Sequence, residues 1–330
     1  RARHRFEPAR RPAGSGLGRW PSPTSSSLAL CRPVTFNRPA VANVLEHVQR
    51  QALRWSGFAS SHVPTAVGRL HVVEKRARGP RPTLCFLHGL SASSVQYAPL
   101  MRRLAPEHWR TLAVDMPAHG FSDVPRRGTD YHSLRDGLFE ALDRLLAWNG
   151  PAVLFGNSMG GFAAIRYAAS RPERVRALVL VSPGGAPMTQ KQFAELLDTF
   201  RLESHDDAVA FLDRLFAQPH PLRHLIAKPV MRQLQRAELK ELIDAMNHHE
   251  LLTPDEVAGL EMPIQFVWGD RDRILPKASR DFFLEHLPRH ARVVLPADFG
   301  HSPQLEAPDE VAALTRSFFA TLDVGSERAA

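Results

Sequence analysis

The chain has 330 residues, of which 44% are hydrophobic and 23% are charged, as is typical of a globular protein with a sizeable core. Its formal net charge of +8 is concentrated in residues 1–38, which hold eight of the 42 basic residues and one of the 34 acidic residues. The near-neutral remainder carries no basic stripe of the kind that binds nucleic acid, and no apolar run reaches the ~18 residues of a membrane span.

Residues 1–38 are rich in Arg, Pro, Ser and Gly and show no hydrophobic periodicity. This composition predicts a disordered basic tail without chemistry of its own. An organellar transit peptide has a similar composition and is the alternative. Cys31 lies in this tail and Cys85 in a predicted core strand, so no disulfide is expected.

Residues 39–65 are predicted to form an amphipathic helix, over 39–56, followed by a linker. The apolar residues of this helix recur at the spacings of one helical face. Such a helix either covers an edge of the domain or makes peripheral contact with a membrane surface. Its apolar face comprises Val41, Val44, Leu45, Val48, Ala52 and Trp55.

From residue 66 onward, strands alternate with helices of 10–15 residues, which predicts a parallel sheet covered by helices on both faces. The α/β core is expected to span 66–186 and 261–322, with a helical lid inserted at 187–260 and a tail at 323–330. The predicted strands are 69–75, 83–87, 110–115, 152–156, 175–181, 264–268 and 292–295. The predicted core helices are 94–105, 133–148, 277–286 and 309–322, together with the one that follows the strand 152–156.

One motif stands between a predicted strand and a predicted helix: Gly156-Asn157-Ser158-Met159-Gly160. This is the pattern of a nucleophile elbow, in which a tight turn exposes a serine hydroxyl above the sheet. The backbone N–H of Met159 starts the helix and is placed to bind an oxyanion. The alternative is an ordinary Gly/Ser turn, which the flanking strand and helix disfavour.

A nucleophilic serine needs a base, and the base needs an orienting acid. Among the 16 histidines, His301 follows the last predicted strand, at the sheet edge where the elbow also lies. Asp270 and Asp272 follow the strand 264–268, and either can supply the acid. The paired His248 and His249 face different sides of a helix, so we expect no metal site there.

Five motifs in order resemble those of the α/β-hydrolase family, over about residues 66–322. They are His88-Gly89-Leu90, Asp115-Met116-Pro117-Ala118-His119-Gly120, the elbow, Gly269-Asp270-Arg271-Asp272 and Gly300-His301. The sequence is most similar to monoacylglycerol lipases and small bacterial lipases with a helical cap. The resemblance implies an α/β-hydrolase fold and selects Asp272 as the acid.

By this resemblance, the protein is expected to hydrolyse carboxylic esters with a lipophilic acyl group through Ser158, His301 and Asp272. The N–H groups of Leu90 and Met159 would bind the oxyanion. In the predicted lid, Phe193, Leu197 and Phe200 belong to one apolar helical stripe, and from this position we expect them to line the substrate pocket. No cofactor or metal is implied, and we expect a monomeric, cytoplasmic protein that takes a small ester or lipid and no nucleic acid. A carbon–carbon bond hydrolase, a cofactor-free perhydrolase and a non-catalytic member of the fold remain alternatives.

Overall fold

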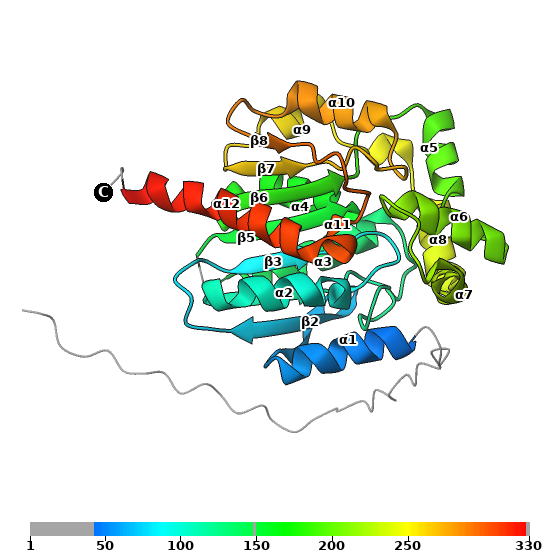
Figure 1. Cartoon of the computed structure of the whole chain (residues 1–330), viewed down its shortest axis with the longest axis horizontal. Coiled ribbons are helices and arrows are strands. Elements are labelled where there is room, and N and C mark those ends of the chain that lie inside the picture. The colour runs from blue at the N-terminus through cyan, green and yellow to red at the C-terminus, as the bar shows by residue number, and fades with distance from the viewer. Residues whose placement is uncertain (1–42, 148–149, 328–330) are drawn as a thin grey trace, which may run out of the picture. The chain divides into compact units, whose positions relative to one another are not determined.

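The computed structural model describes residues 43–147 and 150–327 (Figure 1). The predicted basic tail, 1–38, and the first four residues of the predicted helix 39–56 lie outside this part of the chain. Within the described residues, no helix is long and apolar enough to cross a lipid bilayer.

Within the described residues, the strands form a sheet in the order β1-β2-β4-β3-β5-β6-β7-β8. β2 runs antiparallel to both β1 and β4, and the neighbouring pairs from β4 to β8 are parallel. The predicted parallel sheet is therefore confirmed. The strands are β1 Ala59–Thr65, β2 Gly68–Arg76, β3 Leu84–Leu87, β4 Arg110–Val114, β5 Ala152–Ser158, β6 Val175–Pro183, β7 Ile264–Val267 and β8 Arg292–Val294.

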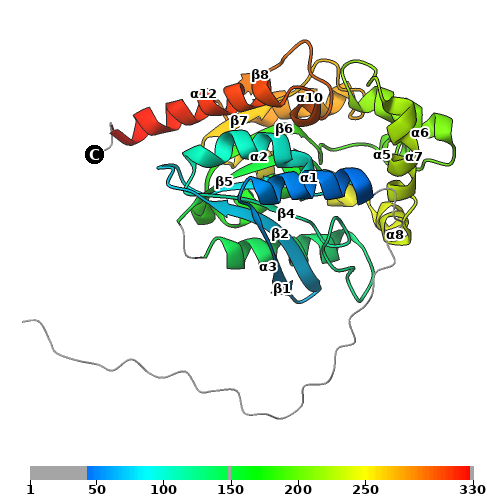
Figure 2. The same cartoon turned by 60° about the horizontal axis from the view of Figure 1, so that its bottom comes forward.

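Strand side chains alternate between two hydrophobic layers, as the period of two in a β-strand requires. Along β3, Leu84 and Phe86 belong to one layer, whereas Cys85 and Leu87 belong to the other. Helices α2 (Ala98–Leu104) and α12 (Pro308–Glu327) cover the first layer. Helices α3 (Tyr131–Leu145) and α4 (Met159–Ser170) cover the second, and Figure 2 shows α3 on the opposite side of the sheet from α2 and α12.

The predicted insertion, 187–260, is helical. Its helices are α5 Gln190–Asp198, α6 His205–Leu215, α7 Arg223–Leu234, α8 Ala237–Ala245 and α9 Pro254–Ala258. Capping boxes at Thr189, Ser204 and Thr253 start α5, α6 and α9, which explains why helices begin at these points. Figure 1 shows α5–α8 beyond the carboxyl ends of β5 and β6. The last helix, α9, instead packs against α4 and α10 (Lys277–His286) and belongs to the layer covering the sheet.

Two boundaries differ from the sequence prediction. The predicted linker contains β1, which pairs with β2 along its whole length. Polar residues and Pro64 obscured this strand, and both are acceptable because β1 is an exposed edge strand. At the other end, α12 continues to Glu327, so residues 323–327 belong to a helix and not to a tail.

The N-terminal amphipathic helix is α1, Asn43–Trp55, and it packs against α2 and the short helix Ser94–Tyr97. Leu53 is buried in the layer that α2 and α12 cover, so this helix covers an edge of the domain. Val48 and Trp55 are 57% and 86% exposed. Membrane contact through this helix stays a prediction.

Candidate active site

Ser158 lies where β5 ends and α4 begins, and its backbone is strained. Its φ of 55° and ψ of −122° fall in a region that residues with a side chain rarely adopt. A Cβ atom at Gly156 would lie 2.4 Å from the carbonyl oxygen of Gly160, and one at Gly160 would lie 2.0 Å from that of Leu87. Glycine at both positions thus allows α4 to start directly against β5 and β3. This is the turn that the elbow motif predicts.

Asp272 and His301 meet at the same edge of the sheet. They follow β7 and β8, and Nδ1 of His301 lies 2.8 Å from Oδ2 of Asp272. The side chain of Asp272 is fully buried and that of His301 is 5% exposed. The other carboxylate oxygen, Oδ1, accepts hydrogen bonds from the backbone N–H groups of Ile274, at 2.9 Å, and Leu275, at 3.1 Å. Both oxygens are therefore fixed, and the carboxylate holds the imidazole in one orientation.

Asp270, the neighbouring acid, points elsewhere. Its side chain is 61% exposed and pairs with Arg280 on α10 at 3.1 Å. It makes no contact with His301 among the interactions of the described residues. The structure thus distinguishes the two carboxylates, which the local sequence leaves as equal candidates for the orienting acid.

The structure also reveals a residue that sequence analysis missed. Asn157 is 2% exposed, and its amide nitrogen donates to the backbone oxygens of His301, at 2.9 Å, and Val181, at 3.0 Å. Its amide oxygen accepts from Gln304 at 3.0 Å. Asn157 therefore joins the elbow to the loop that carries His301. Its position directly before Ser158 was the only signal in the sequence.

A second set of hydrogen bonds joins the histidine loop to residues 213–217 of the insertion. The backbone N–H of His301 donates to Leu215 O at 3.0 Å. The two carboxylate oxygens of Glu306 accept from Gly300 N at 2.7 Å and from Ala217 N at 2.9 Å. Arg273, next to Asp272, donates to the carbonyl oxygens of Asp213 and Phe216. The insertion is thus tied to both loops that hold the imidazole–carboxylate pair.

The loop after β3 approaches Ser158 from the other side. A Cβ atom at Gly89 would lie 3.2 Å from the Cβ of Ser158. The buried ring of His88 braces this loop, because Nδ1 lies 2.8 Å from Gly89 O while Nε2 accepts from Met116 N at 3.0 Å. Burial lowers the pKa of His88, which favours the neutral ring that this pattern requires.

Asp115 binds the end of the same loop, the one that follows β3, through the backbone N–H of Ser94. Its carboxylate accepts from the N–H groups of Ser94, at 2.5 Å, and Phe121, at 2.8 Å, and lies 2.9 Å from Nδ1 of His71. Burial acts to raise the pKa of Asp115, but the hydrogen bond and charge of His71 outweigh it and hold the pKa far below its usual range. Burial also lowers the pKa of the neighbouring His119 to about 3. A buried carboxylate thus anchors the loop.

A small apolar cavity of about 50 Å³ lies beside Met159, the residue after Ser158. Helices α3, α4 and α8 form its walls. Leu90 and Met159 also pack against Leu134 of α3 and Leu242 of α8. The lining residues are Met116, Tyr131, Leu134, Arg135, Leu138, Phe139, Met159, Phe162, Ala163, Arg166, Leu242 and Met246.

The three pocket residues predicted from sequence lie elsewhere. Phe193 and Leu197 of α5 are each 7% exposed and pack in the large hydrophobic layer, and the ring of Phe200 lies 5.7 Å from that of Phe211. None of the three lines the cavity beside Met159. Their contribution to a substrate pocket stays a prediction. In the described part of the chain, no cluster of three or more His, Cys, Asp or Glu is arranged to hold a metal.

Two curated proteins similar to this chain have names that describe ester hydrolysis. Lipase 1 of Psychrobacter immobilis is 28% identical over 254 residues, which cover 73% of this chain and 77% of the lipase. The pimeloyl-[acyl-carrier protein] methyl ester esterase of Xanthomonas campestris pv. campestris (strain B100) is 29% identical over 259 residues, covering 74% and 97%.

Solved structures show the same architecture. A bacterial membrane phospholipase A superposes with a TM-score of 0.72 at 24% identity, over 86% of this chain and 92% of the phospholipase. At this identity the likeness concerns the fold alone. The family model for the α/β hydrolase fold matches residues 82–308, well over half of the chain. The protein therefore belongs to the α/β-hydrolase fold family, as its five motifs predict.

Proposed function

We propose that this α/β hydrolase cleaves carboxylic esters with a lipophilic acyl group, using Ser158 as nucleophile, His301 as base and Asp272 as the orienting acid. One observation carries the proposal: the buried 2.8 Å contact between His301 and Asp272 lies at the same sheet edge as the strained Ser158. The names of the two curated relatives support ester hydrolysis. The apolar cavity beside Met159 supports a lipophilic group.

These positions support the following mechanism. The hydroxyl oxygen of Ser158 attacks the ester carbonyl while Nε2 of His301 takes the hydroxyl proton. The carboxylate of Asp272 holds the proton on Nδ1 and stabilises the imidazolium that forms. His301 then returns a proton to the leaving alcohol. In the second half of the reaction, water attacks the acyl group on Ser158 while His301 takes a proton from the water. His301 returns this proton to the Ser158 oxygen as the carboxylic acid leaves.

The negative charge on the carbonyl oxygen needs hydrogen-bond donors. Met159 is the first residue of α4, so its N–H has no acceptor within the helix. Leu90 N–H, in the loop braced by His88, has no acceptor among the described residues. These two donors would stabilise the tetrahedral intermediate, at about 3 kcal/mol each by comparison with similar sites.

A substrate screen tests the proposal. The wild type should hydrolyse p-nitrophenyl esters, and Ser158→Ala should lower kcat by about 10⁴–10⁶ while its melting temperature is kept. A vinylogous diketone acid, the substrate type of carbon–carbon bond hydrolases, should be cleaved slowly or not at all. Faster cleavage of this acid than of any ester would replace ester hydrolysis with carbon–carbon hydrolysis on the same residues.

A further inference from the structure

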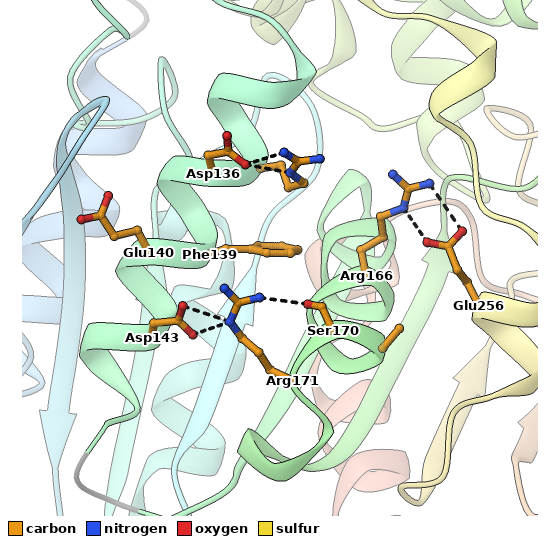
Figure 3. Close-up of a pocket in the computed structure, with 10 residues that line it drawn as sticks. Asp136, Phe139, Glu140, Asp143, Arg166, Ser170, Arg171 and Glu256 are labelled. Atoms are coloured by element: carbon orange, nitrogen blue, oxygen red, sulfur yellow. Dashed lines mark hydrogen bonds and ion pairs between the residues drawn. The ribbon is translucent and has the colours of Figure 1, made fainter.

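The apolar cavity beside Met159 and a groove lined by charged residues share part of their lining. The apolar cavity beside Met159 is on the inner side. On the outer side, an open groove runs between α3 and α4 (Figure 3). Three residues line both hollows and form the wall between them: Arg135, Phe139 and Arg166. The remaining groove residues are Asp136, Glu140, Asp143, Ala169, Ser170, Arg171 and Glu256.

The two arginines of the wall are engaged by partners of their own. Arg135 pairs with Asp136 at 2.7 Å. Arg166 pairs with Glu256 at 3.0 Å and also donates to Leu251 O at 3.0 Å and to the hydroxyl of Tyr131. The cavity surface itself is almost wholly apolar. A ligand in it therefore meets mainly hydrocarbon, and both guanidinium groups at this end already have partners.

Phe139 is the uncharged member of the wall, and Figure 3 shows it between the ion pairs of α3. It is 9% exposed, and its ring lies 5.2 Å from the ring of Tyr167, edge to face. The guanidinium of Arg171 lies 5.4 Å above it, on the groove side. Packed against these two neighbours, Phe139 lies between the cavity and the groove.

The side walls of the cavity are more adaptable than this end. The cavity, at about 50 Å³, has room for roughly two methylene groups if each occupies ~30 Å³, the volume of a water molecule in the liquid. Three methionines, Met116, Met159 and Met246, line the sides, and methionine changes rotamer at little cost. A longer chain can therefore widen the cavity until it reaches the aromatic end wall.

We propose that this cavity binds the acyl chain of the ester and that Phe139 sets the maximum chain length. The substrate class is an unbranched, uncharged acyl chain of short to medium length. This inference rests on the proposed function, and it locates the acyl site between α3, α4 and α8 instead of beneath α5. Phe139 is then a specificity-determining residue, 19 positions before Ser158 in the sequence.

The test compares p-nitrophenyl esters from acetyl to dodecanoyl on the wild type, three cavity variants and one control variant. For the wild type, kcat/KM should rise by up to about fourfold per methylene, equivalent to ~0.8 kcal/mol, and then fall once the cavity is full. Phe139→Ala should move the maximum to a longer chain, and Phe139→Leu should move it part of the way. Ala163→Leu, which adds volume inside the cavity, should move the maximum to a shorter chain.

Phe318→Leu is the matched control for packing, because Phe318 is 3% exposed on α12 in the other hydrophobic layer. It should lower the melting temperature and leave the maximum unchanged. A second series, alkyl butyrates that vary only the alcohol, should respond equally in wild type and Phe139→Leu.

The outcomes separate the two proposals. An identical chain-length maximum in wild type, Phe139→Leu and Ala163→Leu, with ester hydrolysis still dependent on Ser158, would overturn the acyl site and keep the proposed function. A shift in the alcohol series alone would overturn the assignment of the cavity to the acyl side. A wild type inactive on every ester would overturn the proposed function, and this inference with it.

Discussion

The histidine side of Ser158 and the α8 side are held by different forces. On the histidine side, hydrogen bonds that Arg273 donates and that Glu306 and Leu215 O accept join the insertion to the loops of Asp272 and His301. On the α8 side, contact is made mainly by apolar side chains of α3 and α8 against Leu90 and Met159. A polar contact on this side is made by Arg236, which donates to Ala118 O at 3.3 Å.

The difference corresponds to two requirements of an esterase. Proton transfer depends on the position of an imidazole within a few tenths of an ångström, and directional hydrogen bonds between buried groups fix such a position. Binding a hydrocarbon chain needs only buried apolar area, which is not directional. We therefore expect substitutions on the histidine side to lower kcat for all esters by the same factor. Substitutions on the α8 side should change which ester is preferred.

The largest difference should appear between the two neighbouring carboxylates. Asp272→Asn should lower kcat by about 10⁴, because an amide can donate to Nδ1 and so favour the wrong imidazole tautomer. Asp270→Asn is the matched control and should lower kcat less than about threefold, since the side chain of Asp270 is exposed and pairs with Arg280 at the surface. Steady-state kinetics on one ester measures both. Equal losses would remove the structural distinction between the two acids.

Glu306→Ala should have the next largest effect. It removes the carboxylate that binds Gly300 N and Ala217 N, and hydrogen bonds to a charged group contribute about 1.5–3 kcal/mol each. We expect a lower melting temperature and a kcat about tenfold lower, by the same factor for acetyl and hexanoyl esters.

Glu310→Ala, at an exposed position on α12, serves as its control. A Glu306→Ala enzyme that kept full kcat, or one that changed its preferred chain length, would contradict the assignment of this carboxylate to positioning the histidine loop.

The smallest effect on kcat should come from the α8 side. Leu242 is 1% exposed and lines the cavity, so Leu242→Ala enlarges it. Preference for hexanoyl over acetyl esters should rise by up to about fourfold per methylene newly accommodated, while kcat on the acetyl ester stays within about twofold. Leu212→Ala on α6, also a buried leucine, should be destabilised similarly without a change in preference. Matching preferences in these two variants would argue against the α8 wall.

Much of the fold follows from local patterns. The strands of the parallel sheet were predicted because their side chains are apolar on both faces. Three helices of the insertion, α5, α6 and α9, begin at capping boxes such as Ser204 with Asp207. β1 was missed because an edge strand needs little apolar surface. Helix α9 was predicted to be part of the lid, but it packs against α4 and α10. The sequence of a short helix does not indicate which elements it packs against.

The candidate site was predictable where a motif surrounds the residue, as for Ser158 and His301. The hydrogen bond from Asn157 to His301 O joins residues 144 positions apart, and no local pattern indicates it. The apolar stripe of Phe193, Leu197 and Phe200 was recognised, but periodicity shows only that a helix face is apolar. Which face lies beside Met159 depends on the path of the chain through α5–α8.

The central claim is that Ser158 is the nucleophile, and covalent labelling tests it most directly. Wild-type protein treated with a fluorophosphonate should gain the mass of one phosphonyl group, and peptide mapping should place it on Ser158. Ser158→Ala should gain none, and Asp272→Asn should react far more slowly than Asp270→Asn. Labelling of Ser158→Ala at the wild-type rate, or a single adduct on another residue of the wild type, would contradict the account.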